Sequence, residues 1–173
     1  MLLYPAYRFR RVWEISPQWL ARQKITVLLL DVDNTLTTHD NPAVDPRVLG
    51  WLEKMRASGI RLAILSNNRQ ERVKPFAEML GLAFFPRAKK PLGHGARRAM
   101  ELLGAGKKET AVIGDQLFTD ILCGRLAGLV PILVEPMELE PFPFFKLKRF
   151  LEKLLLHRCT IPFEAGKDRK EAE

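Results

Sequence analysis

The chain has 173 residues, of which 47% are hydrophobic and 28% are charged, and these proportions are typical of one globular domain with an adequate core. No apolar run reaches the roughly 18 residues of a membrane-spanning helix, and the first residues lack the basic-then-apolar order of a secretory signal. The two cysteines show neither metal-ligand spacing nor a disulfide framework, which favours a reducing, cytoplasmic location.

The net charge of +8 favours an anionic partner. Phosphorylated substrates, acidic lipid surfaces and nucleic acids are the classes that such an excess attracts. A solvated basic surface without any such partner is the alternative. We expect no specific recognition of nucleic acid.

Five apolar runs alternate with helical patterns along the chain. Strands are predicted at 25–31, 60–67, 82–85, 110–115 and 130–135, and helices near 46–58, 69–80, 92–103 and 117–127. Glycines stand where these helices should end, at Gly59, Gly81, Gly104 and Gly128. Strands that are apolar throughout and separated by helices indicate an α/β fold with a parallel sheet covered on both faces. Residues 1–160 should form this single domain, and 161–173 should be a disordered tail.

Polar residues follow three of the predicted strands at the point where each one ends. Asp31 and Asp33 end or follow the first strand, Ser66 and Asn67 end the second, and Asp115 ends the fourth. The carboxyl ends of parallel strands meet at one edge of a sheet, where ligands bind. Carboxylates that converge there suggest a hard dication such as Mg²⁺, which keeps water and substrate phosphate in its coordination shell.

These residue types suit phosphoryl transfer. Asp31 can act as a nucleophile that forms an aspartyl-phosphate, and Asp33 can protonate the leaving oxygen and later activate water. The segment "RAKKP" at 87–91 adds a lysine that can balance the charge of the transferring group. Each motif alone is more often a turn or a helix cap. All of them together, in order after successive strands, are hard to explain by turns.

The segments "DVDNTLT", "LSNN", "AKKP" and "GDQLFTDIL" resemble the four motifs of the haloacid dehalogenase (HAD) superfamily phosphatases. They are most similar to the YqeG-like branch of subfamily IIIA, which is related to phosphatidylglycerophosphate phosphatases. This resemblance implies a HAD-like, Rossmann-like, doubly wound sheet and a Mg²⁺-dependent phosphomonoester hydrolase.

The resemblance also implies a role for each matching residue. Asp31 would be the nucleophile and a metal ligand, and Asp33 would be the general acid and base and lend its backbone carbonyl to the metal. Lys90 would neutralise charge at the phosphoryl oxygens, and Lys89 is the poorer candidate because the family lysine directly precedes the proline. The remaining assignments are Asp115 as a metal ligand, Asp120 as a supporting residue behind the site, Ser66 as the phosphoryl ligand, and Thr35 and Asn67 as substrate-binding residues.

The spacing leaves no room for a cap domain, because about a dozen residues separate Asp33 from the next helical pattern. An open site in this superfamily suits large or surface-bound substrates. The resemblance favours hydrolysis of phosphatidylglycerophosphate to phosphatidylglycerol, and a soluble or macromolecular phosphomonoester is the alternative. A non-catalytic basic protein that binds acidic lipid or RNA is the alternative of another class.

Two segments suggest contact with a membrane. Residues 8–19 mix arginines with aromatic residues, and residues 144–157 place an apolar series at helical spacing: Leu147, Phe150, Leu151 and Leu154. Basic residues occupy other positions of this second segment: Lys146, Lys148, Arg149 and Lys153. A basic amphipathic helix is typical of a peripheral anchor, here at the inner membrane face. The alternative is a helix that packs its apolar series against the sheet.

Overall fold

The computed structural model describes residues 2–38, 43–138, 143–157 and 161–164. The elements follow in the order β1 (Tyr7–Phe9), η1 (Val12–Glu14), α1 (Pro17–Arg22), β2 (Val27–Leu30), α2 (Pro46–Ala57), β3 (Arg61–Leu65), α3 (Gln70–Leu80), β4 (Ala83–Phe85), α4 (His94–Leu102), η2 (Lys107–Glu109), β5 (Thr110–Gly114), η3 (Leu117–Ile121), α5 (Leu122–Ala127), β6 (Val130–Val134) and α6 (Pro143–His157).

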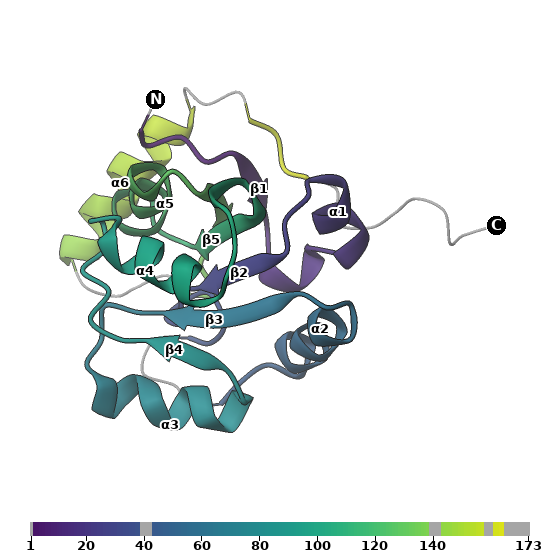
Figure 1. Cartoon of the computed structure of the whole chain (residues 1–173). Coiled ribbons are helices and arrows are strands. Elements are labelled where there is room, and N and C mark those ends of the chain that lie inside the picture. Colours follow the sequence, from purple (N-terminus) through teal and green to yellow (C-terminus); the bar gives the residue numbers. More distant parts are fainter. Residues whose placement is uncertain (1, 39–42, 139–142, 158–160, 165–173) are drawn as a thin grey trace.

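The six strands form one parallel sheet in the order β1-β6-β5-β2-β3-β4 (Figure 1). From β2 the chain winds outward through β3 to β4, and it then returns to the other side of β2 with β5 and β6. The direction of winding therefore reverses between β2 and β5. In open α/β sheets this switch point leaves a crevice at the carboxyl ends of the strands, and it is where Asp31 and Asp115 follow their strands.

Helices cover both faces of the sheet. One face packs Leu28 and Leu30 of β2 against α1, α2 and α3. The opposite face packs Val27 and Leu29 of the same strand against α4 and α5. Every residue of β2 is buried, as the uniformly apolar pattern of a central parallel strand requires. The predicted doubly wound α/β fold is confirmed, and the described residues contain no inserted domain after β2 or β3.

Local signals explain why these helices begin and end where they do. Ser16 accepts a hydrogen bond from the backbone N–H of Trp19, and Pro17 takes the first helical position of α1. Helices α3 and α5 end at Gly81 and Gly128, both in the left-handed conformation, which glycine adopts without steric cost.

The N-terminal segment belongs to the core, and the sequence prediction missed this. Tyr7, Arg8 and Phe9 pair with β6 as an edge strand. Phe9 and Trp19 are buried and their rings meet edge to face at 4.9 Å. Phe9 and Trp19 are therefore core residues, and a membrane contact through the segment 8–19 stays a prediction.

A short C-terminal segment lies against the N-terminal strand. Residues 161–164 lie along β1, where the backbone N–H of Glu164 donates to the carbonyl of Arg8 at 2.8 Å. The indole N–H of Trp19 donates to the Glu164 carboxylate at 3.1 Å. These contacts attach residues 161–164 to the domain, and residues 165–173 lie outside the described part of the chain.

Helix α6 packs against the sheet through a face other than its apolar series. Leu155 and Leu156 contact a cluster formed by Leu117, Ile121 and Leu133. Glu152 is buried, and its carboxylate accepts a hydrogen bond from the backbone N–H of Leu117 at 2.9 Å. The predicted series is instead exposed, at 43–63% for Leu147, Phe150, Leu151 and Leu154. Among the described residues, no helix is long and apolar enough to cross a bilayer.

Candidate active site

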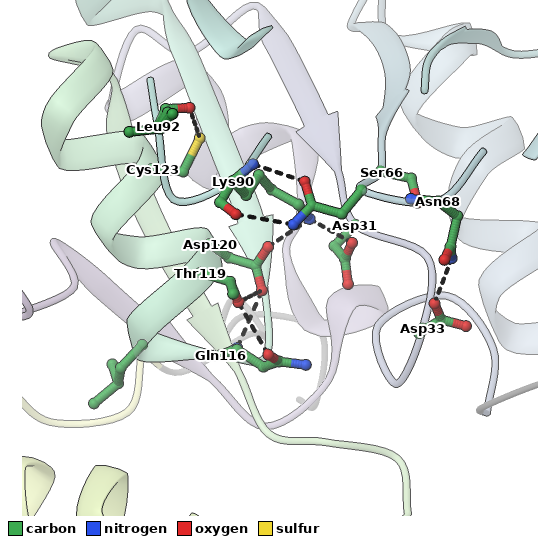
Figure 2. A network of polar contacts seen from close by, with 12 residues as sticks. Asp31, Asp33, Ser66, Asn68, Lys90, Leu92, Gln116, Thr119, Asp120 and Cys123 are labelled. Atoms are coloured by element: carbon green, nitrogen blue, oxygen red, sulfur yellow. Dashed lines mark hydrogen bonds and ion pairs between the residues drawn. The ribbon is translucent and has the colours of Figure 1, made fainter. Parts of the chain in front are cut away.

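Lys90 lies at the centre of the site, between two carboxylates (Figure 2). Its ammonium donates to Oδ1 of Asp31 at 2.5 Å and to Oδ1 of Asp120 at 2.7 Å. Asp31 follows the end of β2, Lys90 lies in the loop before α4, and Asp120 belongs to η3. All three side chains are at most 12% exposed. A buried charge is tolerated when it is paired and hydrogen-bonded, so the three groups depend on one another.

Burial and charge act together on the two titrating groups of this cluster. Burial raises the pKa of the Asp31 carboxyl to about 7, against the lowering effect of Lys90. Burial alone would lower the pKa of the Lys90 ammonium, but Asp120 and Asp31 outweigh it and raise that pKa above its usual value. Lys90 therefore stays charged at neutral pH and can face an anionic group in the crevice.

Three carboxylates could hold a metal ion together. One oxygen from each of Asp31, Asp115 and Asp120 lies within 4.8 Å of the others. Carboxylate oxygens are the ligands that hard dications take, so this set of donors fits Mg²⁺. The Asp33 side chain is not among these three, and metal binding through its backbone carbonyl stays a prediction.

Asn67 holds the backbone of Lys90. The Asn67 amide donates to the Lys90 carbonyl at 2.9 Å and accepts from the Lys90 N–H at 2.7 Å. Both ends of the Asn67 amide are thus occupied by the chain around the lysine. These two hydrogen bonds fix the loop that carries Lys90, and substrate binding by Asn67 stays a prediction.

Two residues that the sequence analysis did not select hold Asp33. The Asn68 amide donates to Oδ2 of Asp33 at 2.9 Å, and the Arg72 guanidinium donates to Oδ1 at 3.2 Å. Asn68 belongs to the "LSNN" segment that follows β3, and its place two residues after Ser66 is a sequence signal for a role at the site. Arg72 lies in the first turns of α3, where an arginine reads as ordinary helix surface.

Ser66 and Thr35 are both buried. The hydroxyl of Ser66 accepts from the backbone N–H of Asn68 at 3.1 Å. The hydroxyl of Thr35 is buried and has no hydrogen-bond partner among the described residues. Substrate binding by Ser66 and Thr35 therefore stays a prediction.

Asp120 approaches the sheet where a glycine leaves room for it. A Cβ atom added to Gly114 would lie 2.3 Å from the Asp120 carboxyl carbon. The second carboxylate oxygen of Asp120 accepts from the backbone N–H of Gln116 at 3.2 Å. Asp120 is thus fixed from behind while its other oxygen accepts from the Lys90 ammonium, and its supporting role stays a prediction.

A cavity of about 450 Å³ adjoins the site. Asp33, Ser66, Asn68 and Arg72 line the part beside the predicted catalytic groups. The remaining lining residues are mostly apolar: Val32, Thr37, Val73, Pro75, Phe76 and Met79. The crevice therefore continues from the carboxyl edge of the sheet along α3.

A doubly wound sheet with paired aspartates after β2, a buried lysine before α4 and further aspartates after β5 defines a hydrolase of the haloacid dehalogenase type. A family model described as haloacid dehalogenase-like hydrolase matches residues 7–128. The chain belongs to this family. The prediction of a HAD enzyme with phosphatase relatives is confirmed.

The chain is also similar to particular proteins. It is 37% identical over 147 residues to the Bacillus subtilis protein named "Probable phosphatase YqeG". The aligned residues cover 85% of this chain and 86% of that protein. It is 30% identical over 157 residues to "Phosphatidylglycerophosphate phosphatase 1, chloroplastic/mitochondrial" of Arabidopsis thaliana. The aligned residues cover 84% of this chain and 44% of that protein. Among solved structures, the cobalt-bound deoxy-D-mannose-octulosonate 8-phosphate phosphatase of Haemophilus influenzae has the same fold, with a TM-score of 0.53 and 18% identity over 78% of this chain and 89% of that one.

Proposed function

We propose that this protein is a Mg²⁺-dependent phosphomonoester hydrolase that works through an aspartyl-phosphate. The observation that carries the proposal is the buried contact of Asp31 with Lys90, beside the oxygen cluster of Asp31, Asp115 and Asp120. A carboxylate fixed by an ammonium next to a cation site is an arrangement suited to nucleophilic attack on a phosphoryl group.

The residues divide the reaction into two steps. In the first, a carboxylate oxygen of Asp31 attacks phosphorus, the bond to the leaving oxygen breaks, and Asp33 gives that oxygen its proton. In the second, Asp33 takes a proton from water, whose oxygen attacks the same phosphorus, and phosphate leaves while the Asp31 carboxylate is regenerated. Lys90 orients Asp31 throughout, and the hydrogen bonds from Asn68 and Arg72 orient Asp33.

Within the cluster, Asp31 and Asp115 would hold the metal together with the backbone carbonyl of Asp33, because both oxygens of Asp120 already accept hydrogen bonds. When bound, Mg²⁺ neutralises charge on the phosphoryl oxygens and on the carboxylates around them. Lys90 supplies a further positive charge at Asp31. Asp120 keeps that charge in place through its 2.7 Å contact with the ammonium.

For the substrate we propose phosphatidylglycerophosphate, which would be hydrolysed to phosphatidylglycerol. The similarity to the Arabidopsis thaliana phosphatase supports this choice. A phosphate group at a bilayer surface needs an open site, and the described residues place no inserted domain over the crevice. The net charge of +8 also favours an anionic lipid.

Helix α6 supports a peripheral contact with an anionic bilayer. Its apolar series at 147, 150, 151 and 154 is exposed although other residues of the helix are packed. The helix sequence contains four basic residues and one acidic residue, Glu152, which is buried. An apolar face on a basic helix is suited to insertion at the headgroup level of an anionic membrane. The contact of Glu152 with Leu117, which follows Asp115 by two residues, places this helix beside the carboxyl edge of the sheet.

The proposed reaction is tested by measuring phosphate release with Mg²⁺ from phosphatidylglycerophosphate micelles and from soluble phosphomonoesters. We expect turnover that is highest on the lipid. The Asp31→Asn protein should fold normally and release no phosphate, because its amide is nearly isosteric but a poor nucleophile. Steady-state turnover by that variant, with deamidation excluded by mass spectrometry, contradicts the covalent mechanism. Activity on soluble esters alone contradicts the lipid substrate.

The membrane contact is tested without turnover, by sedimentation with phosphatidylglycerol vesicles and with neutral phosphatidylcholine vesicles. We expect binding to the anionic vesicles that weakens as salt rises and falls about tenfold in Phe150→Gln. Leu102→Gln is the matched control, because Leu102 is 67% exposed and ends α4 at the opposite edge of the sheet. Equal binding by Phe150→Gln and the wild type contradicts the contact, and a change in oligomeric state would instead make α6 an interface between copies.

A further inference from the structure

The cavity beside Asp33 has two kinds of wall. Its polar end contains Asp33, Ser66, Asn68 and Arg72, and Arg72 contributes the only formal positive charge among the lining residues. Its other end is formed along α3 by Val73, Pro75, Phe76 and Met79. A cationic group next to hydrocarbon side chains in one cavity is suited to a ligand that is itself anionic and partly apolar.

The position of the cavity decides which part of a substrate would enter it. Asp33 gives its proton to the oxygen that leaves phosphorus, so the rest of the leaving group must lie on the Asp33 side of the phosphoryl group. Asp33 and Ser66 line the cavity, and Arg72, which also lines it, contacts Asp33. A leaving group that extends from the reacting phosphate therefore passes Arg72 first and then the apolar wall.

Arg72 can bind an anion while it stays in contact with Asp33. Its Nη2 donates to Oδ1 of Asp33 at 3.2 Å, and its side chain is 44% exposed. A guanidinium has five N–H donors in a planar fork and pairs well with phosphate oxygens. An ion pair with this much exposure contributes little to stability.

We propose that this cavity is a leaving-group subsite that selects phosphomonoesters whose leaving group carries a second, phosphodiester anion next to hydrocarbon. Arg72 binds the phosphodiester, and Val73, Phe76 and Met79 contact the hydrocarbon that follows. The inference rests on the proposed phosphatase function and deepens it by naming the features of the substrate that this site recognises. Arg72 is then a specificity-determining residue.

The first test needs no turnover. Dihexanoylphosphatidylglycerol, kept below its micelle concentration, carries the phosphodiester and short acyl chains but no phosphomonoester. Its binding to the wild type, to Arg72→Gln and to Lys74→Gln is measured by titration calorimetry. We expect binding to weaken at least tenfold in Arg72→Gln. Lys74→Gln is the matched control, because it removes the same charge from α3 at an exposed position that does not line the cavity. Equal binding by Arg72→Gln and the wild type overturns the subsite.

The second test separates recognition from the support that Arg72 gives to Asp33. The ratio of kcat/KM for dihexanoylphosphatidylglycerophosphate to kcat/KM for 4-nitrophenyl phosphate is compared between the same proteins. We expect this ratio to fall at least tenfold in Arg72→Gln, mainly because KM for the lipid rises. In Lys74→Gln the ratio should equal that of the wild type. An equal loss on both substrates shows that Arg72 acts only through Asp33 and overturns the subsite.

A further comparison addresses the apolar wall. Met79→Gln should lower the activity on the dihexanoyl substrate relative to its deacylated analogue by about threefold or more, because the analogue keeps the phosphodiester without the acyl chains. An unchanged ratio removes the apolar part of the proposal. If the product lipid binds in an Arg72-dependent way but the wild type hydrolyses no phosphomonoester, the proposed function fails and the binding subsite stands.

Discussion

Replacement of Gly114 by alanine tests whether the position of Asp120 controls the site. Gly114 ends β5, and the ideal position of an added Cβ lies 2.3 Å from the Asp120 carboxyl carbon and 2.5 Å from its Cβ. Carbon atoms in contact are normally about 3.5–4.0 Å apart, so Asp120 must retreat by about 1 Å. The 2.7 Å contact between Asp120 and Lys90 would then exceed the usual hydrogen-bond range of about 3.2 Å.

The size of the effect follows from this displacement. A misplacement of about 1 Å in a reacting constellation can cost about a hundredfold in rate, so kcat/KM of Gly114→Ala should fall by about that factor. Overpacking of a buried site costs about 1–3 kcal/mol. A domain of this size loses about 2–4 °C of Tm for each kcal/mol. Phosphate release and a thermal melt therefore measure the two consequences separately.

Gly50→Ala is the matched control for this variant. Gly50 lies inside α2, and no atom stands within 4 Å of an added Cβ. Alanine in a helix interior is favoured over glycine by about 0.5–1 kcal/mol, so this protein should melt slightly higher and keep its activity. A Gly114→Ala protein with activity within about threefold of the wild type, well short of the expected loss, would refute the reasoning about Asp120.

Three further outcomes are expected. Excess chelator should abolish phosphate release, and added Mg²⁺ should restore it. Ca²⁺ should support phosphate release poorly, because its coordination shell is larger and looser. Full activity in chelator would exclude a metal-dependent reaction. Burial raises the pKa of the Cys123 thiol to about 11, against the lowering effect of Lys90. In a Cys159→Ser background, iodoacetamide at pH 8 should therefore modify Cys123 roughly two hundredfold more slowly than a free thiol. Rapid labelling of the native protein would contradict the burial of this thiol. The side-chain hydrogen bond from Arg47 lowers the pKa of the Asp45 carboxyl to about 2, so the stability that Asp45 contributes is present above its unfolded pKa of about 3.9 and is lost as pH falls toward 2. The difference in Tm between the wild type and Asp45→Asn should thus shrink between pH 7 and pH 2, and a difference that grows on acidification would disagree with this sign.

The parts of the structure that the sequence predicted are those with a strong local pattern. Asp31 and Asp115 directly follow apolar runs, and a parallel sheet brings the ends of such runs together. Strand β1 was missed because it has three residues, one of them an arginine. That pattern is too short and too polar to indicate a strand, and only its pairing with β6 defines it.

Other residues could not be assigned because their roles depend on packing. In the sequence, Glu152 is one charged residue among several in an amphipathic helical pattern, which suggests an exposed side chain. In the structure it is buried and accepts a hydrogen bond from the N–H of Leu117. Arg72 reads as helix surface, and its role depends on the loop that brings Asp33 to it. The helical spacing of the apolar series in α6 was visible, but spacing alone could not decide whether that series faces the sheet or solvent.

The two loops that carry the aspartates are both braced by the chain that follows residue 128. The backbone N–H groups of Met137 and Glu138 donate to the carbonyl and the side chain of Asn34, in the loop that carries Asp31 and Asp33. Glu152 accepts from Leu117 in the loop that carries Asp115. The matched family region ends at residue 128, so it contains every predicted catalytic group but neither of these braces. A fragment cut to that region would keep the catalytic side chains and lose the hydrogen bonds that position the two loops. Related chains could for the same reason diverge in activity through substitutions far along the sequence from any catalytic aspartate.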